Sequence, residues 1–453
     1  MNGKRKNNWL HLDLKGAIPS VGKLLEQLEF WKDCGYDGIV WEYDDRIPWQ
    51  SWPGTWRGGY TIQEQRRLMD ACRKLELETV PLIQIQGHLE WLLKHERYSG
   101  WRENGVSSEL CPLHPEVLPR LKKWIDEITT LHPGSRFLHL GADETWYMGK
   151  CGKCSLHDKM ELYGEHVSRL CNYVLEKGWR PLIWADMFWR EKRLDVAARL
   201  PVGTILVDWQ YDGAPPYETT EALLECGHEV MGASGVMTGW WEHCYRVQSE
   251  PESRVRNVSA WNRWAMEKNI GMIHTTWTRG ASLWNIYGPW HGALPAFIAG
   301  GNPERWERHP WHGFMERLAR IMEQDVPDEL DRAATEMLEL PADGSIEVES
   351  RRWWNLALRY QSLQKQLLIH RSTRTCLEQV GKFVGRDKTM FHRNCILPFA
   401  ELLPKAEQWE EEARAFWRDN ELSDTEEFMA THIGIMINEI KYYLNTKTEV
   451  PFL

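Results

Sequence analysis

Eight short apolar runs recur over residues 9–277, and each is followed by a segment of amphipathic character. The runs are brief and contain many β-branched and aromatic residues, which is typical of strands buried on both faces of a parallel sheet. They cover residues 9–14, 38–42, 79–85, 137–141, 181–185, 204–208, 229–233 and 272–277. Eight strand–helix units over about 300 residues favour an α/β fold of the closed (β/α)8 type, the TIM barrel, over an open sheet.

The segments between the runs carry apolar residues at helical spacing. Leu24, Leu28 and Trp31 lie on one face of the first such segment, as expected of a helix packed on a barrel. Before the third run, Thr61 is followed three residues later by Glu64, a spacing that predicts a capping box at a helix start.

The character of the chain changes after about residue 300. Strand patterns become scarce, and helical patterns cover residues 314–323, 351–371, 406–420 and 429–444. A chain of 453 residues also exceeds the usual size of one domain. We therefore predict two domains: a (β/α)8 catalytic barrel over residues 1–309 and an α-helical C-terminal region over residues 310–453.

Composition excludes several classes of partner. The net charge of −10 argues against nucleic acid, because phosphate binding needs a clustered basic surface. No apolar stretch is long enough to span a bilayer, and no secretory signal is recognisable, so we expect no membrane partner. Ten cysteines without a dense spacing pattern favour free thiols in a reducing compartment. The expected location is the cytoplasm.

Tryptophan is unusually abundant, with 27 in the chain. Many of them belong in the core, because indole rings bury well. The excess is also a weak indication of carbohydrate binding, since the apolar C–H faces of sugars stack on indole rings.

The strongest candidate site follows the fourth run. In TIM barrels the active site lies at the carboxyl ends of the strands, and here an apolar strand leads through Gly141 and Ala142 to Asp143 and Glu144. Glycoside cleavage needs a carboxylic acid to protonate the leaving oxygen and negative charge beside the oxocarbenium-like centre. Two neighbouring carboxyl groups resist simultaneous ionisation, which keeps one of them protonated. The alternative is a solvated Asp-Glu pair in a loop.

Several motifs resemble one enzyme family. The segment His139-Leu140-Gly141-Ala142-Asp143-Glu144 is similar to the His-x-Gly-Gly-Asp-Glu motif of glycoside hydrolase family 20, the β-N-acetylhexosaminidases, with Ala142 in place of the second glycine. Other segments resemble the hexosaminidase D-like branch of that family. These are His11-Leu12-Asp13-Leu14-Lys15-Gly16, Glu42-Tyr43-Asp44-Asp45, Gly87-His88-Leu89-Glu90 and Trp184-Ala185-Asp186-Met187.

The resemblance implies substrate-assisted catalysis without a cofactor. Glu144 would be the general acid and base, and Asp143 would orient the substrate's 2-acetamido group so that its carbonyl oxygen attacks the anomeric carbon. Asp143 would also balance the charge of the oxazolinium intermediate, a role that requires a carboxylate fixed in advance. The configuration at the anomeric carbon would be retained.

The resemblance also implies a set of substrate-binding residues. His88 matches the family's active-site histidine. Family members wall the sugar pocket with tryptophans at strand ends, so we expect about two of Trp184, Trp209 and Trp277 to line it, the remainder being core. Further candidates are Tyr211 as a donor to the acetamide oxygen, and Glu42, Asp13 and Asp186 as acceptors from sugar hydroxyls. Each of these acids has an ordinary alternative as a salt-bridge partner at the barrel rim.

Cys151 and Cys154 form a Cys-x-x-Cys pair, which is half of a zinc site. Cys111, His114, His157 and Cys171 are further donors whose distance from the pair is not fixed by the sequence. We expect reduced thiols and no metal.

Three hypotheses remain open at this stage. The first is an exo-acting β-N-acetylhexosaminidase for terminal β-linked GalNAc or GlcNAc, with a slight preference for GalNAc, acting on small glycosides or oligosaccharides. The second is a retaining glycosidase with an enzyme carboxylate as nucleophile, and the third is a non-catalytic carbohydrate-binding barrel. A homodimer is one option for assembly.

Overall fold

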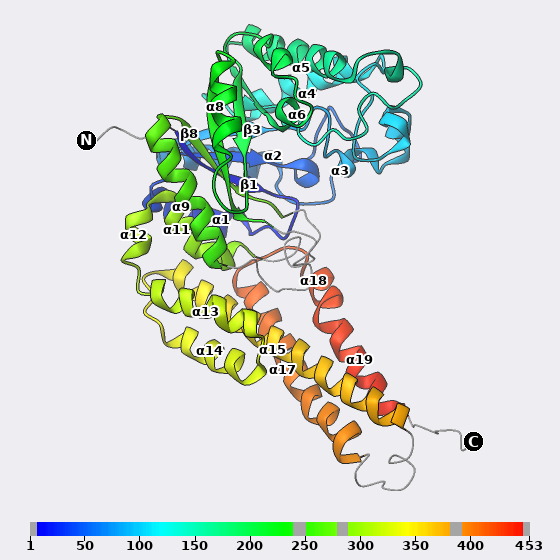
Figure 1. Cartoon of the computed structure of the whole chain (residues 1–453), viewed down its shortest axis with the longest axis vertical. Coiled ribbons are helices and arrows are strands. Elements are labelled where there is room, and N and C mark those ends of the chain that lie inside the picture. Colours follow the sequence, from blue (N-terminus) through cyan, green and yellow to red (C-terminus); the bar gives the residue numbers. More distant parts are fainter. Residues whose placement is uncertain (1–6, 239–250, 279–288, 381–391, 447–453) are drawn as a thin grey trace.

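The computed structural model describes residues 7–238, 251–278, 289–380 and 392–446. A barrel forms one end of the molecule and a bundle of long helices extends from it (Figure 1). The eight parallel strands close in sequence order, and β1 pairs with both β2 and β8. They are β1 (Asn8–Asp13), β2 (Gly38–Glu42), β3 (Glu78–Leu82), β4 (Phe137–His139), β5 (Arg180–Trp184), β6 (Ile205–Trp209), β7 (Glu229–Met237) and β8 (Gly271–Thr276). The predicted TIM barrel is confirmed.

Strand bounds differ from the predicted runs in two informative places. β4 ends at His139 rather than at Gly141, because Gly141 and Ala142 adopt positive φ angles of 64° and 72°, which extended strands do not allow. β7 continues to Met237, four residues beyond its predicted end, and carries an irregularity between Gly235 and Met237.

Helices surround the barrel as the periodicity predicted. The predicted capping box is present, since Thr61 and Glu64 exchange side-chain to backbone hydrogen bonds at the start of α2. The principal barrel helices are α1 (Val21–Cys34), α2 (Ile62–Lys74), α4 (Val117–Leu131), α5 (Lys159–Glu176), α8 (Tyr217–Glu225), α9 (Pro251–Lys268) and α11 (Leu294–Gly301). Short helices α3 (Glu90–Leu93), α6 (Asp186–Arg190) and α7 (Leu194–Ala198) lie within the connecting loops.

The C-terminal region is helical, but its helices are longer or more divided than predicted. They are α12 (Pro303–Glu307), α13 (His312–Gln324), α14 (Pro327–Glu339), α15 (Ser345–Val380), α17 (Leu397–Asp419), α18 (Thr425–Thr431) and α19 (Ile433–Asn445). The helix predicted over residues 429–444 is two helices, because His432 between them has φ −113° and ψ −92°. None of the described helices combines the length and the apolar character that crossing a bilayer needs.

Two hydrophobic cores lie in the helical region. Trp311, Phe314 and Leu318 belong to the same buried cluster as the barrel's helices, together with Trp354 and Leu358 of α15. A second cluster, built around Trp353, Trp409, Phe416, Trp417 and Phe428, joins the other face of α15 to α17, α18 and α19. The proposed boundary between residues 309 and 310 therefore falls within a continuous core, and the second core begins only in α15.

The turn between α17 and α18 contacts the loop that follows β1. Backbone hydrogen bonds join Ser20 N–H to the Glu421 carbonyl at 3.1 Å and Ser423 N–H to the Ile18 carbonyl at 3.0 Å. The buried Arg46 guanidinium also forms an ion pair with Asp424. These contacts join the helical region to the loop after β1, at the carboxyl-terminal end of the barrel.

Candidate active site

Asp143, Glu144 and His88 meet at the carboxyl-terminal end of the barrel. His88 Nε2 lies 3.1 Å from Asp143 Oδ2 and 3.3 Å from Glu144 Oε2. The Asp143 side chain is 7% exposed, whereas that of Glu144 is 33% exposed. The structure thus brings together the predicted catalytic pair and His88, one of the predicted substrate-binding residues, with one carboxylate enclosed and the other accessible. Their ligand atoms lie within 4.8 Å of one another, close enough to share a cation.

The backbone at this point is strained. Ala142, Glu144 and His88 all have positive φ angles, of 72°, 49° and 55°. Residues other than glycine rarely adopt such φ angles. Each such residue costs on the order of 1–3 kcal/mol, so the conformation persists only where the surrounding structure imposes it. Because β4 stops early and its chain turns sharply, the Asp143 and Glu144 side chains both reach His88 Nε2 but differ in exposure, 7% against 33%.

Glycines allow the loops after β3 and β4 to approach closely. A Cβ on Gly87 would lie 2.5 Å from the Asp143 carbonyl oxygen, and one on Gly141 would lie 1.9 Å from Gln84 Oε1. The absence of a side chain at Gly141 leaves room beside this strand end, and Gln84 fills it. Gln84 in turn donates to Glu42 Oε1 at 3.2 Å.

Asp186 is completely buried beneath the acid pair. Its Oδ2 accepts a hydrogen bond from the Glu144 backbone N–H at 3.2 Å and lies 3.6 Å from Arg190 Nε. Burial, reinforced by the negative charge of Asp143, raises the pKa of Asp186 to about 7. With its side chain 0% exposed, Asp186 holds the backbone of Glu144 and offers no surface to a ligand in this conformation.

Asp13 and Glu42 belong to a buried ionic network centred on Lys15. Lys15 Nζ lies 2.9 Å from Asp13 Oδ1, 2.7 Å from Glu42 Oε1 and 3.1 Å from Asp44 Oδ2. The other Glu42 oxygen lies 2.9 Å from His11 Nε2. Asp13 and Glu42 have no exposed side-chain surface, and Lys15 retains 15%. The salt-bridge alternative for the two acids therefore describes this conformation, and Lys15 is the group that reaches solvent.

The predicted aromatic residues form one continuous cluster. Trp209 and Tyr211 stack with ring centroids 4.9 Å apart, and Trp277 lies 6.3 Å from Tyr211 and 5.9 Å from Trp184. Trp209, Tyr211 and Trp277 each keep 7–8% exposure, whereas Trp184 keeps none. Arg190 lies over the Trp209 ring at 5.3 Å. Trp184 is the fully buried member of the cluster, and the other three each keep a small exposed area.

Sequence reasoning missed two residues that shape the loop after β4. Tyr163 of α5 donates its hydroxyl to the Ala142 carbonyl at 2.8 Å. His139 Nδ1 accepts from the Gly141 N–H at 3.0 Å, and burial lowers the pKa of this imidazole to about 3. The neutral ring also packs 4.3 Å from that of Trp184. His139 was visible as part of the motif, whereas nothing in the pattern of α5 distinguishes Tyr163 from an ordinary core residue.

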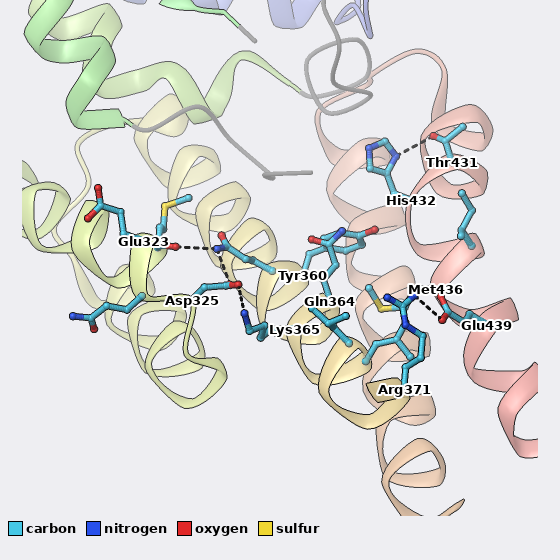
Figure 2. Close-up of a pocket in the computed structure, with 16 residues that line it drawn as sticks. Glu323, Asp325, Tyr360, Gln364, Lys365, Arg371, Thr431, His432, Met436 and Glu439 are labelled. Carbon is cyan, nitrogen blue, oxygen red and sulfur yellow. Dashed lines mark hydrogen bonds and ion pairs between the residues drawn. The ribbon is translucent and has the colours of Figure 1, made fainter. Parts of the chain in front are cut away.

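A separate hollow lies in the helical region. A cavity of about 700 Å³ lies between the end of α13, α15 and α18–α19. Figure 2 shows the side chains that line it, with ion pairs from Asp325 to Lys365 and from Arg371 to Glu439. None of its lining residues is a predicted site residue.

The fold and site define a (β/α)8-barrel protein with an acidic pair at the end of its fourth strand. Sequence comparison identifies the family, because residues 45–285 match the model of the glycosyl hydrolase family 20 catalytic domain. The chain belongs to this family.

Two curated relatives are both named hexosaminidase D. The protein of Homo sapiens is 30% identical over 294 residues, which cover 60% of this chain and 60% of the relative. That of Bos taurus is 33% identical over 190 residues, covering 39% of this chain and 55% of the relative. The chain thus spans little more than half the length of these relatives.

Solved structures share the fold at low sequence identity. A β-N-acetylhexosaminidase from Bacteroides fragilis NCTC 9343 has a TM-score of 0.51 and 18% identity, covering 66% of this chain and 65% of its own. An N-acetyl-β-hexosaminidase from Streptomyces plicatus has a TM-score of 0.51 and 15% identity, covering 77% and 69%.

Proposed function

We propose that the chain is an exo-acting, retaining β-N-acetylhexosaminidase that removes terminal β-linked GalNAc or GlcNAc, with a slight preference for GalNAc. Membership of family 20 and the two hexosaminidase D relatives support this proposal. The observation that carries it is the placement of the His88 imidazole within 3.1 Å of the Asp143 carboxylate and 3.3 Å of the Glu144 carboxylate, beyond the end of β4.

In the proposed mechanism Glu144 is the general acid. Its accessible carboxyl group protonates the glycosidic oxygen while the bond from that oxygen to the anomeric carbon breaks. The substrate's acetamide oxygen forms the new bond to the anomeric carbon, which gives an oxazolinium ion. Water then attacks the same carbon, the acetamide oxygen departs, and the proton of that water returns to Glu144. Two inversions retain the configuration.

Asp143 has the complementary role. Its carboxylate, buried and held beside His88 Nε2, is fixed before substrate arrives, so it orients the acetamide N–H and stabilises the positive charge without reorganisation. Edges of Trp209 and Trp277 would pack on the sugar and the acetamide methyl group, and the Tyr211 hydroxyl would donate to the acetamide oxygen. The predicted cytoplasmic location and the homodimer remain predictions.

The role of Glu144 as the general acid is tested by comparing Glu144→Gln with wild type on two substrates that differ in their leaving group. Nitrophenolate departs without a proton, whereas an alkyl alcohol needs one. We therefore expect the rate of glycosidic-bond cleavage to fall on the order of 10²–10⁴-fold on the alkyl β-N-acetylhexosaminide, and far less on the aryl one. Equal losses on both substrates would exclude Glu144 as the acid, and an inactive wild-type protein would favour the carbohydrate-binding alternative.

Substrate preference needs a direct comparison. The rates of the wild-type protein on nitrophenyl β-GalNAc and nitrophenyl β-GlcNAc, measured as kcat/KM, decide which sugar is preferred. Hydrolysis of the corresponding 2-hydroxy glycosides at similar rates would instead favour an enzyme carboxylate as nucleophile.

A further inference from the structure

Three cysteines from the loops after β3 and β4 lie close together. Cys111 Sγ lies 3.5 Å from Cys154 Sγ and 3.7 Å from Cys151 Sγ. Glu103 completes the group, because one ligand atom from each of the four residues lies within 4.8 Å of all the others. Glu103 and Cys154 are completely buried, Cys111 is buried, and Cys151 is partly exposed.

The sulfur separations are those of a shared metal. A disulfide requires about 2.05 Å between sulfurs, and these pairs are far longer. Tetrahedral zinc with a Zn–S distance of about 2.3 Å places neighbouring sulfurs about 3.8 Å apart. The two measured separations of 3.5 and 3.7 Å are close to this value.

Glu103 supplies an independent indication of a cation. Its side chain is wholly enclosed, and Oε1 accepts a hydrogen bond from the Cys151 N–H at 2.6 Å. Oε2 is buried and is bonded to no backbone N–H, the neighbouring donor to this carboxylate is the Cys154 thiol, and among the described residues no lysine, arginine or histidine forms an ion pair with Glu103. Enclosing a carboxylate without a compensating charge is costly, and a metal ion coordinated by Oε2 removes that cost.

The backbone around the cysteines is arranged as in metal-binding turns. The Cys154 N–H donates to Cys151 Sγ at 3.4 Å. The Ser155 N–H donates to the Cys151 carbonyl at 2.9 Å and closes the turn. A Cβ on Gly152 would meet no atom within 4 Å, so the turn is open at this residue.

We propose that Glu103, Cys111, Cys151 and Cys154 bind one structural Zn²⁺ ion. Thiolate ligands with one carboxylate suit zinc in a closed tetrahedral site, and binding releases the thiol protons to solvent. The interpretation of the sequence as reduced thiols is thereby revised. The other candidate zinc ligands in the sequence, His114, His157 and Cys171, lie outside this group.

The ion would tie together the two loops that carry the proposed catalytic residues. Glu103 and Cys111 lie between β3 and α4, as does His88, whereas Cys151 and Cys154 lie between β4 and α5, after Glu144. Zinc here supports the position of the catalytic loops and takes no part in the chemistry.

Metal analysis of the full chain tests the proposal without relying on activity. We expect about one zinc ion per chain by inductively coupled plasma mass spectrometry after production in zinc-supplemented medium and purification under reducing conditions. Cys111→Ser and Cys154→Ser should each lose most of the metal. Cys376→Ser changes an exposed cysteine outside the group and should keep it.

The wild-type protein alone also gives a decisive measurement, should the cysteine variants fail to fold. Replacement of zinc by Co²⁺ should produce the intense visible bands of tetrahedral cobalt and a thiolate charge-transfer band in the near ultraviolet. Purified protein with no zinc and with all three thiols open to alkylation, or with a disulfide between two of them, would overturn the proposal. Zinc retained by both Cys111→Ser and Cys154→Ser would overturn it as well.

Discussion

Asp186 shows how a buried carboxyl group couples the site to pH. Its pKa is raised to about 7 by burial and by the charge of Asp143, so folding favours its protonated form. The stability that this preference provides is complete below the ordinary pKa of an aspartate and is lost as the pH rises through about 7.

We therefore expect Asp186→Asn to change the free energy of unfolding more favourably at about pH 8 than at about pH 5. The amide oxygen still accepts from the Glu144 N–H, and the amide carries no charge at either pH. Urea unfolding of both proteins at the two pH values measures this difference. A substitution effect that is equal at both values would show that Asp186 does not titrate in this range.

Individual residues also mark the limit of what the sequence predicts. Asp143, Glu144 and His88 were predicted, because strand-end position and motif both indicate them. Gln84, Tyr163 and Glu103 were not, since their roles arise from contacts between segments far apart in the chain, which no local pattern records. Ala142 looked like a mild departure from the family motif, yet its φ of 72° places it where glycine is favoured.

At the scale of elements, the loops after β3 and β4 depend on their close approach at Gly87. Gly87→Ala would force a Cβ to 2.5 Å from the Asp143 carbonyl oxygen, so the loops must separate. A shift of this kind costs on the order of 10²-fold in kcat/KM and about 1–3 kcal/mol of stability.

Steady-state kinetics and denaturant unfolding of this variant check both effects. Gly100→Ala lies in the same connection between β3 and α4, and its Cβ would meet no atom within 4 Å, so it should behave as wild type. Wild-type kinetics in Gly87→Ala would contradict the importance of this contact.

The elements themselves were largely predictable from periodicity. Strand type and order follow from short apolar runs, and the capping box fixed one helix start. The predicted ends of elements were wrong where the backbone departs from regular strand or helix angles. This occurs at the early end of β4 and at His432 between α18 and α19. Hydrophobic patterns carry no information on such angles.

At the scale of the whole molecule, the helical region completes the core of the barrel. Trp311, Phe314, Leu318, Trp354 and Leu358 pack in the same cluster as the barrel's helices. A fragment of residues 1–309 would expose the surface that they cover, and we expect it to be insoluble or to lack a cooperative unfolding transition. Expression of the fragment beside the full chain, with circular dichroism on heating, tests this. A soluble, cooperatively folded fragment would instead establish 1–309 as an autonomous domain.

The proposed reaction depends on attack by the substrate's own acetamide oxygen, aided by Asp143 and Glu144. The most direct measurement is kcat/KM on a series of aryl β-N-acetylhexosaminides whose acetyl methyl group carries successively more fluorine atoms. Fluorine withdraws electrons from the acetamide oxygen, so we expect a steep fall in kcat/KM with each substitution. Rates that stay level along the series would contradict it.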